Sequence, residues 1–487
     1  MEPSTADTHI STLLFTEDRV FKLLKPLANA FLDHTDTADR IAAATREVEL
    51  NARIAPDIYL GTADVIEHGE IADRMIVMRR LPAERSVTRM LATGDLTADH
   101  VRSIARKIAT FHASLPPLDY QGRAAEAHAS RWHDNISELG PFVGRVISQA
   151  DVNRVTELST TWLDSHAELL DQRITDGYLR DGHGDLLADD VFCMDDGPEI
   201  LDCLAFRDDL RLVDVLDDVA FLAMDLHRLA GPSWARLLLR YYAEYSGEHH
   251  PGSLAHYYVA YRAHVRCKIA CLRVDSLEHE FAAVARMYHR LCLDHLERAS
   301  LRLILVGGGP GSGKTTLANM LSNQLGCPVL SSDGIRKDLA GVERTVHELA
   351  RPDAGIYAAE RTEETYAEIL RQAGLLLSAG ETVIIDASWT SAKHRALAYA
   401  LAAQQHARVT SLDCCIPVDV AKERIVRRMA DTTSTSDATP EIVDHLAQQR
   451  APWPEAIAID TNQSFHEVEV AALAALNTSL SQGPSRT

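Results

Sequence analysis

The sequence predicts two unrelated folds in one chain: an α+β domain over about residues 1–299, then an α/β domain with a parallel sheet over residues 300–487. Three observations support this prediction. A chain of 487 residues is too long for one ordinary domain. The first block has a strand-rich part to about residue 85 and a mostly helical part from about 86 to 299. After residue 300 short buried strands alternate with helices, which is typical of a parallel sheet.

Local patterns define the elements of the first domain. Residues 11–24, "STLLFTEDRVFKLL", predict a hairpin of two apolar runs around a turn at Thr16–Asp18. Residues 39–54 have the periodicity of an amphipathic helix, and residues 75–82 read as a short strand that proline ends. Further on, "VFCM" and "EILDCLAF" flank "DDGP" and predict a second hairpin. These elements place strands at the start of the domain and a small hairpin inside its helical part.

Composition narrows the class of protein. Hydrophobic residues make up 46% of the chain and charged residues 24%, as in soluble globular proteins. The formal net charge of -21 repels nucleic acids and anionic membranes, so a nucleic-acid partner is disfavoured. No stretch reads as a membrane span or a signal peptide, and the eight cysteines lack metal-binding spacing. We therefore expect a cytoplasmic protein; the sequence does not predict its oligomeric state.

A glycine-rich motif opens the second domain. "GGGPGSGKTT" satisfies the P-loop pattern, with a strand-like run before it and an amphipathic helix after it. In such a loop successive backbone N–H groups converge on phosphate oxygens at a helix N-terminus. Lys314 is expected to reach the β- and γ-phosphates and Thr315 to ligate Mg²⁺. The predicted nucleotide-binding residues are Gly308, Gly309, Pro310, Gly311, Ser312, Gly313, Lys314, Thr315 and Thr316.

Polar residues after the next strands suggest a kinase. Asp333 follows the second strand, where it is placed to accept a proton from a substrate hydroxyl, and Arg336 is placed to hold an anionic substrate. Asp386 ends the third strand. A carboxylate at this position in P-loop proteins lies beside the water shell of Mg²⁺, and we expect the same of Asp386. The alternative for Asp333 is an ordinary helix cap.

In the second domain a basic helix precedes a loop rich in threonine, serine and aspartate. Arg424 and Arg428 lie just before residues 431–440, "DTTSTSDATP", which we predict to be a mobile lid. A closing lid would bring these arginines onto the transferring phosphoryl group, which makes them candidate catalytic residues. A solvated basic helix face is the equally favoured alternative.

The first domain carries a second set of kinase-type residues. A protein-kinase-like site needs a strand lysine on the phosphates, a helix glutamate that holds it, a loop aspartate facing the acceptor, and metal-binding side chains. The candidates in chain order are Lys22, Glu47, Asp185, Asp190 and Asp202. Asp185 belongs to "DGHGDLLADD", in which His183 reads as a structural residue. Asp202 is predicted in the second strand of the hairpin that follows.

These motifs resemble known families. The first block, over about residues 10–295, is similar to the aminoglycoside-phosphotransferase-like family, and the second to small P-loop kinases such as gluconate, shikimate and polynucleotide-end kinases. The whole chain resembles bacterial proteins that fuse two such domains. The resemblance implies a protein-kinase-like bilobal domain followed by a P-loop kinase, with ATP and Mg²⁺ as cofactors and a small-molecule hydroxyl as acceptor.

Two positions depart from the family pattern. Asp190 stands where asparagine is usual, and Ala205 where a glutamate tends to be. Asp190 remains a competent Mg²⁺ ligand but adds charge to a crowded acidic site. The first domain is therefore either an active kinase or a degenerate one that binds nucleotide for regulation; a nucleic-acid 5′-hydroxyl kinase is the third hypothesis. Arg266, in a basic stretch of the helical part, is placed either to meet an anionic acceptor or to form a salt-bridged surface.

Overall fold

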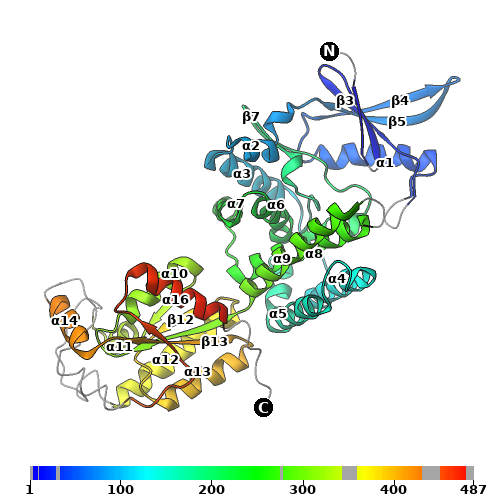
Figure 1. The fold of residues 1–487 in the computed structure, drawn as a ribbon. Helices are drawn as coiled ribbons and strands as arrows, with labels where there is room; N and C mark the ends of the chain where they lie inside the picture. The colour runs from blue at the N-terminus through cyan, green and yellow to red at the C-terminus, as the bar shows by residue number, and fades with distance from the viewer. Residues whose placement is uncertain are drawn as a thin grey trace. The chain divides into compact units, whose positions relative to one another are not determined.

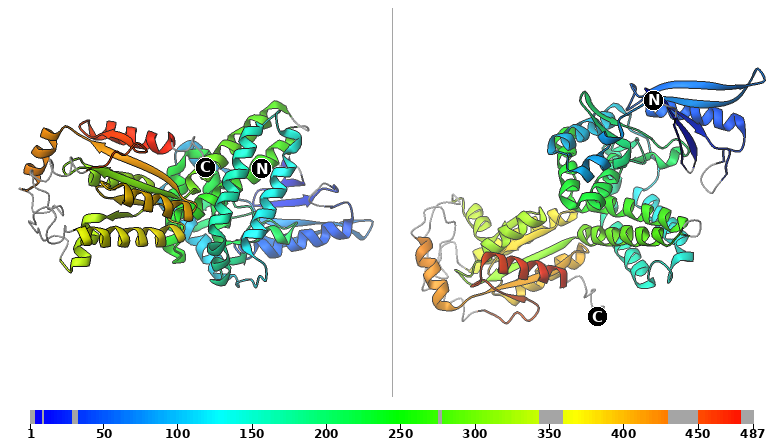
Figure 2. Two further views of the ribbon diagram at one scale, coloured as in Figure 1. Left: turned by 90° about the horizontal axis from the view of Figure 1, so that it is seen from below. Right: turned by 45° about the horizontal axis from the view of Figure 1, so that its top comes forward.

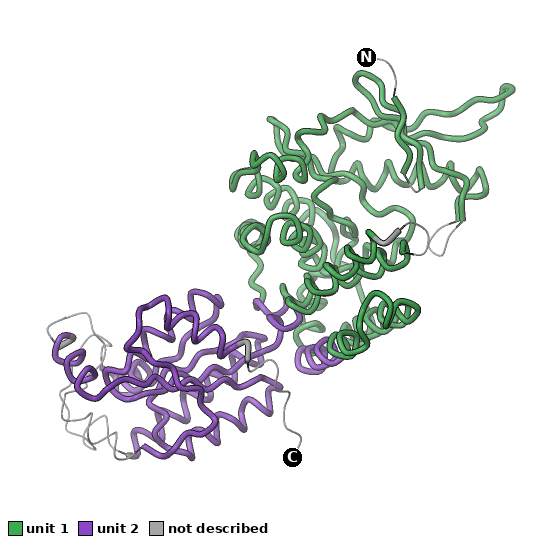
Figure 3. Tube along the Cα trace, in the orientation of Figure 1, with its two compact units in different colours: residues 1–156, 167–250, 255–295 green, residues 157–166, 251–254, 296–487 purple. Residues whose placement is uncertain are grey.

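The computed structural model describes residues 4–8, 10–28, 33–274, 278–342, 359–429 and 450–478. The chain forms two compact units, shown in green and purple in Figure 3. The first comprises residues 1–156, 167–250 and 255–295, and the second comprises residues 157–166, 251–254 and 296–487. No helix within the described residues is long and apolar enough to cross a bilayer.

The first unit begins with a five-stranded antiparallel sheet in the order β1-β2-β3-β5-β4 (Figure 1). Its strands are β1 (Ser4–Asp7), β2 (Ser11–Phe15), β3 (Arg19–Leu24), β4 (Tyr59–Glu67) and β5 (Glu70–Arg79). The predicted hairpin is confirmed, since β2 and β3 pair from Ser11–Leu24 to Phe15–Val20. Helix α1 (Thr37–Asn51) packs on this sheet, and Asp36 caps it by accepting a hydrogen bond from the N–H of Ala38.

The rest of the first unit is mostly helical, as predicted. The helices in this part of the chain are α2 (Val87–Thr93), α3 (Ala98–Ser114), α4 (Ala124–Glu138), α5 (Gln149–Thr175), α6 (Val215–Ala230), α7 (Pro232–Ser246), α8 (Gly252–Arg273) and α9 (Glu278–Ala299). Helix α6 is buried continuously from Val215 to Leu226, because its sequence is apolar on nearly every face. It forms the centre of the helical part.

Two short antiparallel pairs interrupt these helices. Strand β6 (Leu179–Asp181) pairs with β9 (Leu212–Asp214), and β7 (Val191–Met194) pairs with β8 (Gly197–Ile200). The second pair is the predicted hairpin, but β8 ends at Ile200, so the prediction that Asp202 lies in a strand is wrong. Asp202 has a left-handed backbone (φ 64°), which is incompatible with continuing the strand.

The second unit is a parallel α/β domain, as predicted, and its strands lie in the order β11-β12-β10-β13-β14. The strands are β10 (Arg302–Gly308), β11 (Val329–Ser331), β12 (Val383–Asp386), β13 (Arg408–Cys415) and β14 (Ile457–Asp460). Helices flank the sheet (Figure 2): α10 (Lys314–Leu325), α11 (Ser332–Ala340), α12 (Ala359–Ser378), α13 (Ala392–Gln404), α14 (Val418–Met429) and α16 (Phe465–Thr478).

Central strand β10 joins two separate hydrophobic cores. Leu303 and Leu305 point into the cluster formed with α12 and α13, whereas Ile304 and Val306 point into the cluster formed with α10 and α16. This division follows from the two-residue period of a strand. Because both faces of β10 are covered, its sequence is apolar without interruption from Leu303 to Val306. The loop that follows is therefore anchored on both sides of the sheet.

Candidate active sites

A buried lysine lies at the centre of the first unit's candidate site. Lys22, on β3, places Nζ 2.8 Å from Glu47 Oε1 on α1 and 3.0 Å from Asp202 Oδ1. Lys22 is 9% exposed and Glu47 is 6% exposed. Glu49, two residues further along the helix, is exposed and pairs with Arg46. The three residues therefore meet; the sequence predicted the pairing of Lys22 with Glu47 but not the contact of Lys22 with Asp202.

Their electrostatics follow from burial and pairing. Burial disfavours the charge of Lys22, but Asp202 and Glu47 outweigh it and hold the pKa of the lysine well above its usual value. Burial raises the pKa of Glu47, with Lys22 opposing that rise. Lys22 lowers the pKa of Asp202, which is therefore the ionised partner of the lysine. Lys22 and Asp202 thus place an ammonium group beside a carboxylate. Phosphate binding needs the first of these groups and metal binding the second.

Backbone contacts hold Asp202 in its left-handed conformation. The hydroxyl of Tyr59 accepts a hydrogen bond from the N–H of Asp202 at 3.2 Å. Asn51 Oδ1 accepts one from the N–H of the next residue, Cys203, at 2.8 Å. Because a non-glycine residue rarely has a positive φ, these bonds offset a local strain, and such strain is common at functional sites.

The His-Gly-Asp loop is fixed by one buried carboxylate. Asp218, at the start of α6, accepts hydrogen bonds from the N–H of His183 at 2.6 Å and from that of Gly184 at 2.8 Å. His112 Nε2 lies 3.0 Å from the same carboxylate. Burial opposes ionisation, but His112 and the loop amides hold the pKa of Asp218 far below its usual value. The loop therefore rests on a permanent negative charge.

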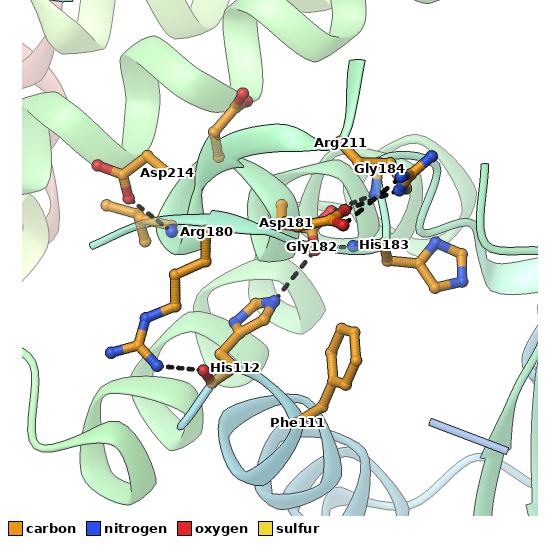
Figure 4. Close-up of polar contacts among 12 residues, drawn as sticks. Phe111, His112, Arg180, Asp181, Gly182, His183, Gly184, Arg211 and Asp214 are labelled. Atoms are coloured by element: carbon orange, nitrogen blue, oxygen red, sulfur yellow. Dashed lines mark hydrogen bonds and ion pairs between the residues drawn. The ribbon is translucent and has the colours of Figure 1, made fainter. Parts of the chain in front are cut away.

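Arginines tie the residues before the loop to their surroundings. In Figure 4, Arg211 reaches Asp181 (Nε–Oδ1 2.7 Å), and Arg180 donates to the backbone carbonyl of His112. Arg53, just after α1, donates to the carbonyls of Asp181 at 3.0 Å and Gly182 at 3.1 Å. His183 itself is buried and its Nε2 lies 2.9 Å from the carbonyl of Leu201, consistent with a structural role. These contacts determine where Asp185 lies.

Asp185 and Asp190 are carboxylates with raised pKa values. Burial raises the pKa of Asp185 to about 6, with Arg266 opposing the shift. Burial, together with Asp202 and Asp185, raises the pKa of Asp190 well above its usual value. Asp190 lies in a short 3-10 helix (Ala188–Asp190) just before β7. A carboxylate with a pKa near neutrality can accept a proton from a substrate hydroxyl.

Part of the predicted basic stretch is structural. Arg262 forms two hydrogen bonds to Asp217, at 2.7 and 2.9 Å, and is buried. Lys268 lies 3.4 Å from Glu138. The charges of Arg266 and, more weakly, Arg262 act on Asp185. A cavity of about 70 Å³ lies at the candidate site of the first unit, and its lining includes Lys22, Glu47, Asp185, Asp202 and Ala205.

The P-loop of the second unit has a backbone that requires glycine. Gly311 has φ 74°, and a Cβ there would lie 2.6 Å from the carbonyl oxygen of Ala421 on α14. Gly313 has φ 85° and is the N-cap of α10. Lys314 and Thr315 are the first two residues of that helix, so their N–H groups point toward the loop. The loop is thus a cradle of backbone donors at a helix N-terminus, the geometry that binds phosphate.

Thr315 and Asp386 form the candidate Mg²⁺ site. Thr315 Oγ1 donates to Asp386 Oδ2 at 2.6 Å, and Asp386 is the last residue of β12, as predicted. Burial raises the pKa of Asp386. Within the described part of the chain its other oxygen, Oδ1, is buried and accepts no hydrogen bond. A hydroxyl and a carboxylate oxygen without a donor fit a hard divalent cation, so these residues would hold Mg²⁺.

Two further predicted groups lie around the P-loop. Asp333 lies in the first turn of α11, directly after β11, with Oδ1 3.8 Å from Arg336 Nη1; Ser331 is the N-cap, not Asp333. Arg424, on α14, donates to the carbonyl of Thr461 at 2.8 Å. The side chain of Arg428 and the predicted lid at 431–440 lie outside the described residues.

Two cavities border the P-loop. One, of about 390 Å³, is lined by Gly311, Gly313, Thr316 and Arg424 together with residues after β14. The other, of about 320 Å³, lies along Gly308, Gly309 and Pro310 and reaches Ser388 and Arg450. Sequence reasoning missed Thr461 and Phe465 in the first cavity. Thr461 Oγ1 donates to the carbonyl of Ser312 at 2.6 Å, and Phe465 offers a ring that is 61% exposed. The sequence offered one indication of these residues: they follow the end of the apolar strand at 457–460, and ligands bind at the carboxyl ends of strands in such sheets.

In the first unit, sequence reasoning missed Asn51, Arg53, His112 and Asp218. The doubled acid at residues 217–218, inside an apolar helix, was the signal for the last of these, because a carboxylate in such a position is buried and needs partners.

The two units together define the class of protein. The first unit has one lobe formed by the five-stranded sheet and α1, and a second lobe that is mostly helical. Lys22 and Glu47 of the first lobe meet Asp202, and this arrangement is a protein-kinase-like bilobal fold. The second unit is a P-loop α/β domain, and residues 303–453 match the family model described as an AAA domain. Folds of these two kinds bind nucleotides in many proteins, including kinases.

Comparison with known proteins identifies the family. Proteins described as uncharacterized in Mycobacterium bovis and Mycobacterium tuberculosis are each 38% identical to this chain over 459 residues, covering 93% of this chain and 91% of theirs. The chain belongs to the same family as these mycobacterial proteins.

Among solved structures, a choline/ethanolamine kinase family protein from Mesorhizobium loti is 15% identical, covering 61% of this chain and 88% of its own (TM-score 0.41). A gluconokinase from Sinorhizobium meliloti is 17% identical, covering 37% of this chain and 93% of its own (TM-score 0.28).

Proposed function

We propose that the protein is a bifunctional ATP-dependent phosphotransferase that acts on hydroxyl groups of small molecules through two separate nucleotide sites. One observation supports this most directly: each unit contains its own lysine and its own metal-competent carboxylate. Lys22 lies beside Asp202 in the first unit, and Lys314 precedes Thr315, which is bonded to Asp386, in the second. When bound, Mg²⁺ neutralises the phosphate charge that develops during transfer.

In the first unit, Asp185 is the proposed acceptor of the substrate proton, and Lys22 holds the phosphates with Glu47 positioning it. Asp190 and Asp202 supply oxygen ligands for Mg²⁺. Arg266 is proposed to meet an anionic group of the acceptor. Of the two arginines whose charges act on Asp185, it has the stronger effect, and the other, Arg262, is bound to Asp217. The buried surroundings strengthen each of these interactions.

In the second unit, the backbone from Gly308 to Thr316 is proposed to cradle the phosphates. Asp333 accepts the proton of the acceptor hydroxyl, and Arg336 holds its anionic part. Arg424, whose guanidinium lies beside the cavity that borders Gly313, is proposed to stabilise the transferring phosphoryl group. Arg428 shares this proposed role on the basis of its sequence position. The net charge of -21 favours a small metabolite over a nucleic-acid end as the acceptor.

Variants of the full chain test the two-site proposal. Lys314→Ala and Asp185→Ala are assayed for ATP binding by calorimetry and for phosphate transfer to a metabolite extract with labelled ATP. Lys314→Ala is expected to remove one of two nucleotide sites, and Asp185→Ala to remove one set of labelled products while both sites still bind. Lys393→Ala is the matched control for the lysine, since Lys393 is exposed on α13 of the same unit. A single nucleotide site in the wild-type protein would contradict the proposal.

A second candidate function has a specific observation in its favour. Asp190 carries a raised pKa among other carboxylates, and Ala205 lines the cavity where the family pattern has a glutamate. A first unit that binds nucleotide for regulation, without transfer, would fit these departures. It predicts that Asp185→Ala leaves every labelled product unchanged, whereas Lys314→Ala removes them all.

A further inference from the structure

Three histidines and an aspartate from three helices meet in the first unit, in a place that the proposed phosphotransfer does not use. His227 lies in the last turn of α6, His256 near the start of α8, and Asp294 and His295 near the end of α9 (Figure 1). His227 is nine residues beyond Asp218 on α6, which is about 14 Å along the helix axis. None of the four residues belongs to the loop that carries Asp185; Asp225, two residues before His227, accepts a hydrogen bond from the N–H of Ala188 in that loop.

Both ring nitrogens of His295 lie within hydrogen-bond distance of a neighbouring imidazole. His295 Nε2 lies 2.7 Å from His227 Nδ1, and His295 Nδ1 lies 2.9 Å from His256 Nδ1. One ligand atom from each of His227, Asp294 and His295 can be chosen so that all three atoms lie within 4.8 Å of one another. His295 is 4% exposed, and His227 and Asp294 are half-buried.

We propose that His227, Asp294 and His295 bind a divalent transition metal ion, and that this ion is Zn²⁺. Two imidazole nitrogens and one carboxylate oxygen, without a thiolate, suit a borderline cation that prefers nitrogen and oxygen ligands. Three protein ligands leave a fourth position for water. The carboxylate of Asp294 supplies the negative charge.

The two imidazole nitrogens are close to the separation that the ion requires. Tetrahedral Zn²⁺ with nitrogen ligands at about 2.0–2.1 Å places two such nitrogens about 3.3 Å apart. His227 and His295 are 2.7 Å apart, so their nitrogens need to separate by about 0.6 Å, which side-chain rotation provides.

His256 acts as a positioning residue. With His295 Nε2 on the metal, its Nδ1–H donates to His256 Nδ1, which fixes the tautomer and the orientation of the ligating ring. Loss of such an outer partner typically costs about 10- to 100-fold in metal affinity.

The test uses untagged full-length protein and Co²⁺ as a spectroscopic probe for Zn²⁺. The wild-type protein is expected to bind one Co²⁺ per chain with the intense visible bands of a tetrahedral site, and Zn²⁺ is expected to abolish them. His227→Gln should weaken affinity at least about 100-fold, and His256→Gln about 10- to 100-fold while retaining the bands. His68→Gln is the control, because the His68 side chain is 92% exposed on the first lobe.

The outcomes separate a built site from incidental binding. Absence of visible bands in the wild type, or equal affinities of His227→Gln and His68→Gln, would overturn the proposal and leave a hydrogen-bonded histidine chain. Circular dichroism verifies folding of each variant. If His227→Gln does not fold, Asp294→Asn decides the question: unchanged Co²⁺ bands and affinity in that variant refute the site, and their loss supports it.

Discussion

Asn51, the last residue of α1, accepts a hydrogen bond from the backbone N–H of Cys203 at 2.8 Å and donates from Nδ2 to the carbonyl of Glu47 at 2.9 Å. It is fully buried. One side chain thus links the helix turn that carries Glu47 to the segment that carries Asp202, although 152 positions separate Asn51 from Cys203. The two partners of Lys22 are therefore positioned together.

Replacing Asn51 should disturb the first unit's site without removing any group that touches the phosphates. Asn51→Ala leaves the N–H of Cys203 buried and unpaired, which typically costs about 1–3 kcal/mol. We expect lower thermal stability and weaker nucleotide binding at the site that contains Lys22, and unchanged binding at the P-loop. Calorimetric ATP titration resolves the two sites, and Asn153→Ala, at an exposed position on α5, is the matched control. Equal weakening of both sites would contradict this role.

Asp190→Asn should stabilise the protein more strongly as pH rises. The pKa of Asp190 is raised in the folded state, so its contribution to stability is present below the ordinary aspartate pKa and is lost as pH rises through the folded pKa. Asparagine does not titrate. We expect the melting temperature of the variant to exceed that of the wild type in chelated buffer, by an amount that grows from pH 4.5 to pH 8.

A matched variant controls for the general effect of removing one negative charge. Asp196→Asn changes an exposed residue in the turn between β7 and β8. A pH-independent difference for Asp190→Asn, or the same trend in Asp196→Asn, would show that burial among carboxylates is not the cause.

Asp218→Asn should destabilise the first unit at neutral pH. The carboxylate accepts two loop N–H bonds and one from His112, and hydrogen bonds to a charged group contribute about 1.5–3 kcal/mol each. Because the folded pKa is lowered, the stabilisation exists above the ordinary aspartate pKa of about 3.9 and is lost only as pH falls below it.

The measurement is urea unfolding followed from pH 7 down to pH 3. We expect a loss of about 3 kcal/mol at pH 7 that narrows in acid. Asp209→Asn removes an exposed acid that pairs with Arg207 and should cost less than about 1 kcal/mol. An Asp218→Asn effect as small as this control would refute the role of the buried charge.

Gly311→Ala should abolish nucleotide binding at the P-loop, since the new Cβ meets the Ala421 carbonyl at 2.6 Å and the backbone keeps φ 74°. Gly374→Ala on α12 is the control in the same unit, because the one atom within 4 Å of a Cβ there is Leu401 Cδ1, at 3.3 Å. Equilibrium dialysis with labelled ATP is expected to detect one site in Gly311→Ala and two in Gly374→Ala. Two sites in both variants would argue against this geometry.

The sequence predicted the elements that follow one strong local pattern. The hairpin at 11–24, the strand ending at Asp386 and the P-loop helix all form, because periodicity and glycine spacing act over a few residues. Strand β4 was not predicted. It is an edge strand whose outward positions include the exposed apolar residues Leu60 and Ile66, so its sequence lacks the apolar/polar alternation that marks a strand.

The site was less predictable where its geometry depends on distant partners. Asp202 leaves the extended conformation because Tyr59 and Asn51 hold its backbone from over a hundred residues away. Likewise, the pattern around Asp218 contains no sign of His112, which packs beside it only in the folded chain. The lysine, glutamate and aspartates of the site could be proposed from their order along the chain. The residues that hold them in place, such as Asn51, Tyr59 and His112, could not.

The burial of strand β10 affects how long the P-loop keeps its folded conformation. Its residues pair with β12 on one side and β13 on the other, and Arg302 to Gly308 are all buried. Amide hydrogens in such a central strand exchange with solvent only when the whole cooperative unit opens. We therefore expect deuterium uptake at 303–306 to be among the slowest in the second unit. The loop would then persist for as long as the domain remains folded, and weakening either core would shorten its lifetime.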